Sequence, residues 1–212
     1  MDQNNEFEIK NQMRQAAKAL IENNIPADIV PSKEEACLLV SKMISDGEVV
    51  RDGGSQSLLE CGIYDMLAAR QVNFVSHNDA SISADERRIH DQEAFSCDTY
   101  LLSANAITMD GEIFNVDGNG NRDAAMLYGP KQVIVIAGCN KITKDLNGAL
   151  QRLETIAAPA NCRRLQISAP CLTSDHCMHC KSVQRICCDY VCVRFQRTQR
   201  IRVILVEEKL GF

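Results

Sequence analysis

The residues with the most specific chemistry in this chain are cysteines, and six of the eleven lie in one segment, residues 171–192. Cys177 and Cys180 are separated by two residues, the spacing at which one tight loop presents two thiolates to the same metal ion. With the cysteines on either side they form a predicted set of four metal ligands: Cys171, Cys177, Cys180 and Cys187. Zinc and an iron–sulfur cluster both accept such a set, so the sequence leaves the metal open.

Two further cysteines, Cys188 and Cys192, can each replace one of these four, and the spacing does not decide between them. Free thiols are the first alternative to a metal, and structural disulfides are the second. The N-terminal residues lack the basic start and the apolar stretch of a signal peptide. We therefore expect a cytoplasmic protein, in which thiols stay reduced and metal binding is favoured over disulfides.

A glycine-serine turn, RDGGSQS at residues 51–57, is the second candidate site. It joins a predicted strand to a predicted helix. Gly53 and Gly54 let the backbone N–H groups approach a ligand, and the hydroxyls of Ser55 and Ser57 add donors for a phosphate or carboxylate. The turn lacks the lysine of a Walker A loop and the third glycine of a dinucleotide fingerprint. The alternative is a tight turn in which a serine only caps the helix.

Two later regions carry further polar residues that suit an anionic ligand. The first region contains Asn105 before the Asp110-Gly111 turn and Asn121 and Arg122 after it, among small residues and glycines. Carboxamides both donate and accept hydrogen bonds, and the guanidinium is a planar fork for an anion, although a structural salt bridge is the alternative for Arg122. Asn140 and Lys141 follow the buried run VIVIA, where a loop at the carboxyl end of a strand commonly binds ligands.

The elements that must position these residues alternate between helix and strand, which predicts an α/β fold with a largely parallel sheet flanked by helices. Helices are predicted at residues 6–23, 36–44, 53–70, 81–95, 124–128 and 143–156. Strands are predicted at residues 27–30, 48–51, 72–76, 99–102, 106–109, 112–116, 132–137 and 202–206. Asp110-Gly111 predicts a β-hairpin. With no repeat or linker, residues 1–212 are expected to form one domain that includes the cysteine-rich C-terminal segment.

Composition excludes two classes of protein. The net charge of −5 gives no basic excess for nucleic-acid binding. No stretch approaches eighteen consecutive apolar residues, so we expect no membrane insertion. The oligomeric state cannot be predicted.

One long motif points to a family. Residues 98–142 read DTYLLSANAITMDGEIFNVDGNGNRDAAMLYGPKQVIVIAGCNKI. This string resembles the LUD-domain family of lactate-utilization proteins, whose members carry a similar series of NAIT, DG, GNR, GP, VIV and NKI motifs. The GGSQSL turn, the AAPAN at residues 157–161, the cysteine pattern at 171–187 and the ending RVILVEEKLGF also match. The resemblance covers nearly the whole chain, from about residue 10.

The resemblance implies the fold shared by ribose-5-phosphate isomerase, glucosamine-6-phosphate deaminase and the class I CoA transferases, with the glycine-serine turn facing an anionic ligand. It also implies action with iron–sulfur partner proteins in the oxidation of L-lactate to pyruvate. Longer relatives add a ferredoxin-like segment with CxxCxxCxxxCP spacing, which this chain lacks. The resemblance therefore does not imply electron transfer by this chain. It also identifies no catalytic residue.

The leading hypothesis is an accessory component or subunit of a lactate-oxidising system, possessing an anionic small-molecule site at the glycine-serine turn. It predicts that removal of Arg122 weakens anion binding and leaves the fold intact. One alternative is an independent enzyme of the isomerase and CoA transferase superfamily, acting on a phosphorylated or CoA-linked substrate. Another is a thiol- or metal-sensing regulatory module. The independent enzyme requires turnover without a partner protein, and the regulatory module requires a response to oxidation or metal loss.

Overall fold

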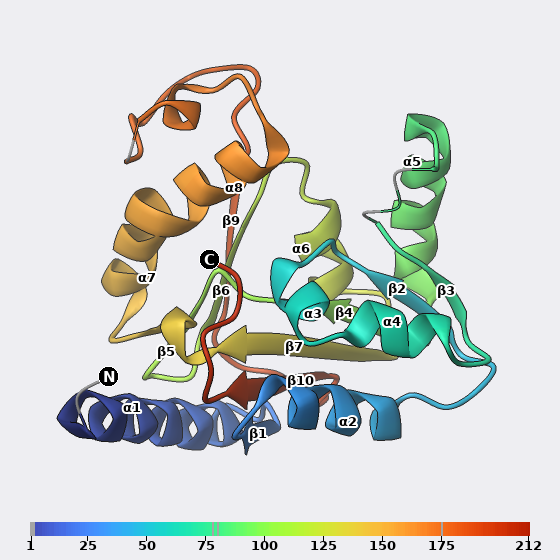
Figure 1. Ribbon diagram of the computed structural model, residues 1–212, viewed down its shortest axis with the longest axis horizontal. Coiled ribbons are helices and arrows are strands. Elements are labelled where there is room, and N and C mark those ends of the chain that lie inside the picture. Colours follow the sequence, from blue (N-terminus) through green and yellow to red (C-terminus); the bar gives the residue numbers. More distant parts are fainter. Residues whose placement is uncertain (1–2, 78, 80, 175) are drawn as a thin grey trace.

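The computed structural model describes residues 3–77, 79, 81–174 and 176–212. Its centre is a parallel sheet with the strand order β1-β10-β7-β4-β2-β3 (Figure 1). The strands are β1 (Ala27–Val30), β10 (Ile201–Val206), β7 (Gln132–Gly138), β4 (Thr99–Leu102), β2 (Val49–Asp52) and β3 (Asn73–Val75). Every neighbouring pair is parallel. The predicted fold class is therefore confirmed.

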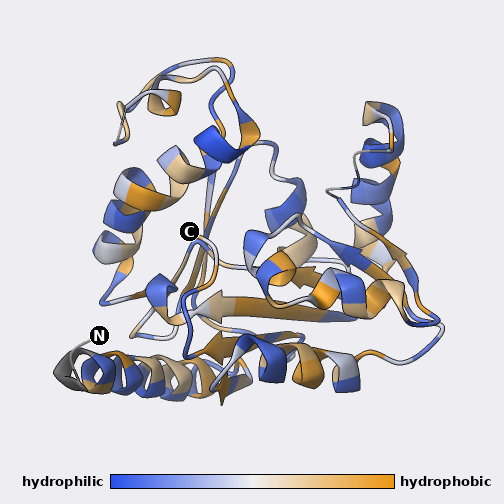
Figure 2. Cartoon of the chain, viewed as in Figure 1, coloured by the Kyte–Doolittle hydropathy of each residue, from blue (hydrophilic) through white to orange (hydrophobic). Residues whose placement is uncertain are grey.

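Helices cover both faces of this sheet because its central strands are apolar on both sides, as β7 and β10 are in Figure 2. On one face Val133 and Val135 of β7 pack in a core with residues of α1 (Gln3–Glu22) and α6 (Asn121–Leu127). On the other face Ile134 and Ile136 pack with three further helices. These are α2 (Lys33–Met43), α3 (Gln56–Glu60) and α4 (Ile63–Ala68).

A second sheet of four strands, in the order β8-β5-β6-β9, carries the remaining core. Its strands are β5 (Ala106–Thr108), β6 (Ile113–Asp117), β8 (Ile142–Thr143) and β9 (Asp189–Val193). The predicted hairpin of β5 and β6 is confirmed, and Gly111 has the positive φ of 77° that its turn requires. An added Cβ at Gly111 would lie 2.4 Å from the backbone of Ala19, so the hairpin tip and α1 touch directly.

A continuous helical segment packs over this second sheet. It consists of α7 (Leu146–Arg152), a π-helical turn at Leu153–Ala157 and α8 (Ala158–Leu165). Ala149, Leu153 and Ala157 of this segment share a buried cluster with Phe114 and Val116 of β6. Beyond α8, the cysteine segment forms the long loop at the top of Figure 1 and returns through β9.

Several predicted boundaries are wrong for local reasons. The helix expected at residues 53–70 is two helices, because Gly62 between them adopts a left-handed conformation. Thr143 lies in β8, and Asp145 caps the next helix by accepting from the Gly148 amide. The helix predicted to end at residue 156 continues as a helical segment through Pro159, since a proline is tolerated in the first turn of α8. The sequence reading also missed β8 and β9, while α5 (Ala84–Glu93) lies within its predicted range.

Candidate functional site

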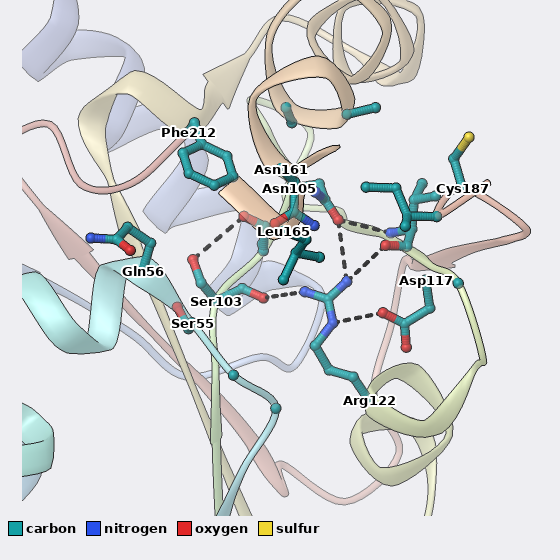
Figure 3. A pocket seen from close by; sticks show the side chains of 18 of the residues that line it. Ser55, Gln56, Ser103, Asn105, Asp117, Arg122, Asn161, Leu165, Cys187 and Phe212 are labelled. Atoms are coloured by element: carbon teal, nitrogen blue, oxygen red, sulfur yellow. Dashed lines mark hydrogen bonds and ion pairs between the residues drawn. The ribbon is translucent and has the colours of Figure 1, made fainter. Parts of the chain in front are cut away.

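A cavity of about 240 Å³ opens where β2, β4 and β7 end. Loops that follow parallel strands meet at one edge of the sheet, which is the usual ligand-binding edge of such folds. The lining includes the glycine-serine turn, the loop after β4, the loop before α6, and the inner side of α8 (Figure 3). Its polar members are Ser55, Gln56, His77, Ser103, Asn105, Asp117, Asn119, Asn121, Arg122, Lys141, Asn161 and Arg164.

The glycine-serine turn forms one wall of this cavity, but the N–H groups of Gly53, Gly54 and Ser55 are already bonded within the protein. The Gly53 amide donates to the Leu101 carbonyl at 3.0 Å, and the Gly54 amide donates to the Asp52 carboxylate at 2.9 Å. The Ser55 amide donates to the Tyr64 hydroxyl at 3.1 Å. These three N–H groups are therefore not available to an anion beside the turn.

Gly53 has a steric role instead. A Cβ built at this position would lie 2.6 Å from Cγ of Arg122 and 2.9 Å from the Tyr100 hydroxyl. The absence of a side chain lets the Arg122 stem cross the turn and reach the cavity wall. Gly54 contributes a different property, a φ of 68° in the left-handed region, which turns the chain toward α3.

Arg122 lies in the wall with its side chain 17% exposed and most of its donors engaged (Figure 3). Its Nε lies 2.8 Å from Asp117 Oδ1, and Nη2 donates to the Val116 carbonyl at 2.9 Å and to Asn105 Oδ1 at 3.3 Å. Burial opposes its charge, but the carboxylates of Asp117 and Asp123 outweigh burial and raise the pKa of Arg122. These contacts are those of a structural ion pair, which is the alternative that the sequence analysis gave for Arg122.

Lys141 lies at the base of the cavity and is buried between two serines. Its Nζ is 2.9 Å from Ser103 Oγ and 3.1 Å from Ser57 Oγ. The Ser103 hydroxyl donates to the Ile136 carbonyl at 2.6 Å, so it accepts from the lysine. Burial, together with the positive charges of Arg152 and Arg122, lowers the pKa of Lys141 to about 7. A substantial fraction of this amine is neutral at neutral pH.

The other predicted ligand-binding residues are divided between the cavity and the surrounding structure. Asn105 and Asn121 line the cavity, and Asn105 Oδ1 also accepts from the Val116 amide. Ser57 is fully buried behind Lys141, and Ser55 caps α3 through Leu58. Asn140 lies outside the lining, where its side chain holds the C-terminal segment through the Leu210 amide at 3.0 Å.

The four predicted metal ligands, Cys171, Cys177, Cys180 and Cys187, all line a second cavity of about 10 Å³. Two of their sulfurs accept hydrogen bonds, Cys177 from the His179 amide at 3.3 Å and Cys187 from Arg185 Nη2 at 3.4 Å. Four thiols around one cavity fit a soft metal in donor type. Within the described ranges, however, no three His, Cys, Asp or Glu side chains are close enough to hold one ion.

The two remaining cysteines of the segment, Cys188 and Cys192, are exposed and line neither cavity. Cys192 lies on β9 opposite Phe114 of β6. Cys187 differs from both because it borders the large and the small cavity. The thiol cavity and the polar cavity therefore share a wall.

Comparison with known proteins identifies the family of this chain. The model of the LUD domain matches residues 13–206. The chain belongs to the LUD domain family. The family is associated with lactate utilization. No curated protein has a detectably similar sequence.

A crystal structure of a DUF162 family protein from Deinococcus radiodurans is similar to this LUD domain with a TM-score of 0.53 and 12% sequence identity. The match covers 93% of this chain and 98% of the other. At this identity the similarity shows the fold alone. In the described residues of this LUD domain, no helix is long and apolar enough to cross a bilayer.

Several polar residues of the LUD-domain cavity were not among the predicted ligand-binding residues, and Ser103, Asn161 and Arg164 are examples. Ser103 directly follows the buried strand β4, and that position at a strand end is a signal that was available. Asn161 and Arg164 lie on α8, and Arg164 is exposed at the cavity with its bonds confined to Asn161 Oδ1 at 2.9 and 3.1 Å. Nothing in the local sequence of α8 indicates that this helix packs beside the glycine-serine turn.

Proposed function

We propose that this LUD domain is a lactate-utilization protein that binds a small carboxylate in the cavity beside the glycine-serine turn. This proposal rests on the charge of the side chains that line the cavity. Arg122, Lys141 and Arg164 all face the cavity, whereas Asp117 is the single carboxylate side chain among the described lining residues. Asp117 is already neutralised by Arg122 at 2.8 Å. The positive charge that remains, that of Arg164 and of the protonated fraction of Lys141, favours an anionic ligand.

The shape of the lining favours a short carbon skeleton next to that anion. Leu153, Ala157 and Leu165 from the helical segment form an apolar side opposite the polar loops. A small 2-hydroxy or 2-oxo acid combines one carboxylate with a few carbons and one further oxygen, so it matches both sides. We propose that the chain acts as an accessory component beside iron–sulfur oxidoreductase subunits in the oxidation of L-lactate to pyruvate.

Arg164 is the most direct test of the anionic site, because its guanidinium has no carboxylate partner among the described residues. Arg164→Gln is expected to weaken binding of L-lactate and pyruvate by about tenfold, the loss of one charge-assisted hydrogen bond. Isothermal titration calorimetry measures both affinities. The matched control is Arg163→Gln, since Arg163 is the exposed neighbour outside the lining and bonds the Ser174 carbonyl.

Equal affinities for the wild type, the Arg164 variant and the Arg163 variant would contradict an anionic site at this wall. Equal weakening in both variants would indicate a general effect of surface charge. Absence of binding by either acid to the wild type would refute the proposed function.

The thiol cavity is a separate proposal. We propose that Cys171, Cys177, Cys180 and Cys187 bind one zinc ion or one iron–sulfur cluster, on the support of their shared cavity and their N–H···S contacts. Anaerobically purified protein is expected to contain about one zinc, or about four irons with four acid-labile sulfides and broad absorbance near roughly 400 nm. A Cys180→Ser variant should lose the metal, whereas Cys192→Ser should keep it. Wild-type protein with neither metal would contradict this proposal.

A further inference from the structure

Lys141 is an unusual residue because it is a buried lysine without a carboxylate partner. It is 4% exposed, and no acidic side chain forms an ion pair with it in the described part of the chain. Lysine is rarely buried in this way unless its charge is paired. Its neighbours are instead the hydroxyls of Ser57 and Ser103. The positive charges of Arg152 and Arg122 lower its pKa. These surroundings oppose protonation of the amine.

A structural role explains this arrangement poorly. A methionine or leucine would fill the same buried volume without the desolvation cost of an amine. Lys141 is also one of the residues that line the 240 Å³ cavity, together with Ser103. A neutral amine beside cationic groups in a small pocket is the environment in which lysine becomes a nucleophile toward carbonyl compounds.

We propose that Lys141 forms a Schiff base with a short 2-oxo acid bound in the cavity. This inference rests on the proposed function, because the carboxylate of the same ligand occupies the anionic site. The two serines hold Nζ in place, and the apolar side chains of the π-helical turn and α8 accommodate the short carbon chain. The cationic wall orients the carboxylate so that C2 of the acid faces the lysine.

The covalent step balances without an oxidant or reductant. The lone pair of neutral Nζ attacks C2, and the C2–O bond breaks after proton transfer. The oxygen leaves as water with the two amine hydrogens, and an imine joins Nζ to C2. The Ser103 hydroxyl accepts from Nζ at 2.9 Å, and it can take part in this proton transfer when its own hydrogen leaves the Ile136 carbonyl.

The test is reductive trapping of the full chain with pyruvate and sodium cyanoborohydride. Cyanoborohydride delivers hydride to C2 and leaves a stable secondary amine on the lysine. Peptide mass spectrometry of wild-type protein is expected to show at least roughly tenfold more adduct at Lys141 than at Lys144, an exposed lysine with an ordinary environment. L-lactate has no carbonyl group, so it should compete for the site and reduce labelling at Lys141 without being trapped.

Variants and calorimetry distinguish failure of the Schiff-base inference from failure of the proposed function. Lys144→Arg should leave the adduct in place and Lys141→Arg should abolish it, and the wild-type peptide map decides even if the Lys141 variant does not fold. Pyruvate binding without an adduct at Lys141 would overturn the Schiff base and leave the proposed function standing. Absence of binding and of adduct would overturn both. Equal labelling of Lys141 and Lys144 would show nonspecific amine chemistry and would also overturn the inference.

Discussion

Arg122→Ala is expected to lower the free energy of unfolding by about 3–5 kcal/mol, the cost of removing one partner from a buried ionic network. Arg122 neutralises Asp117 at 2.8 Å and lies 3.9 Å from Asp123 Oδ1. Asp123 is buried, and neither of its side-chain oxygens has a hydrogen-bond partner. The variant leaves two carboxylates without a counter-ion. Urea unfolding followed by circular dichroism measures the difference.

The pH dependence of this loss has a definite sign. Burial raises the pKa of Asp123 to about 7, so the folded state binds this proton more strongly than the unfolded state does. Such a carboxyl destabilises the fold as pH rises from about 4 to about 7. Without Arg122 that pKa rises further. The loss in Arg122→Ala should therefore be larger at pH 8 than at pH 5.

Two comparisons identify the network as the cause. Arg164→Ala removes a cavity arginine without a carboxylate partner and should cost less than about 1 kcal/mol. Adding Asp123→Asn to Arg122→Ala should restore part of the lost stability, a coupling that a double-mutant cycle measures. A loss below about 1 kcal/mol for Arg122→Ala, with anion binding abolished, would restore the sequence-based expectation that Arg122 serves the ligand and leaves the fold intact.

The sequence predicted the elements whose signals are local. The uninterrupted apolar run of β7 and the Asp110-Gly111 turn correspond to a strand and a hairpin in the structure. The sequence did not predict β9, because Cys192 in this strand and Cys187 and Cys188 just before it were interpreted as candidate metal ligands. Its pairing with β6 is tertiary, since Cys192 faces Phe114 from far along the chain.

The candidate site, too, was predicted where the signal is local and missed where it depends on tertiary contacts. Gly53, Arg122 and Lys141 were expected near a ligand because each lies at a strand or helix end, and the cavity contains all three. Their roles depend on contacts over long separations, which local patterns do not encode. Lys141 and Ser57 are 84 residues apart and meet at 3.1 Å. The glycine-serine turn likewise suggested free N–H groups, and its acceptors Leu101 and Tyr64 are visible only in the fold.

Lys141→Met is expected to stabilise the fold at pH 6 and to do so less at pH 9, by a difference of about 2–3 kcal/mol. The pKa of Lys141 is about 7 in the folded chain against an ordinary 10.5, so the unfolded state binds this proton more strongly. The cost of burying the charged amine is complete below pH 7 and disappears as pH rises toward 10.5. Arg152 and Arg122 increase that cost, and Glu60 partly offsets it.

The difference between the two pH values isolates the charge from the packing. A methionine changes volume and dispersion contacts equally at both pH values, and the Asp123 carboxyl titrates in both proteins, so these contributions cancel. Urea unfolding of wild type and variant at pH 6, 7, 8 and 9 gives the curve. Lys144→Met, at an exposed position, should show a small effect without pH dependence. A pH-independent effect of Lys141→Met would mean that this amine is charged in the fold, which would remove the neutral nucleophile that a Schiff base requires.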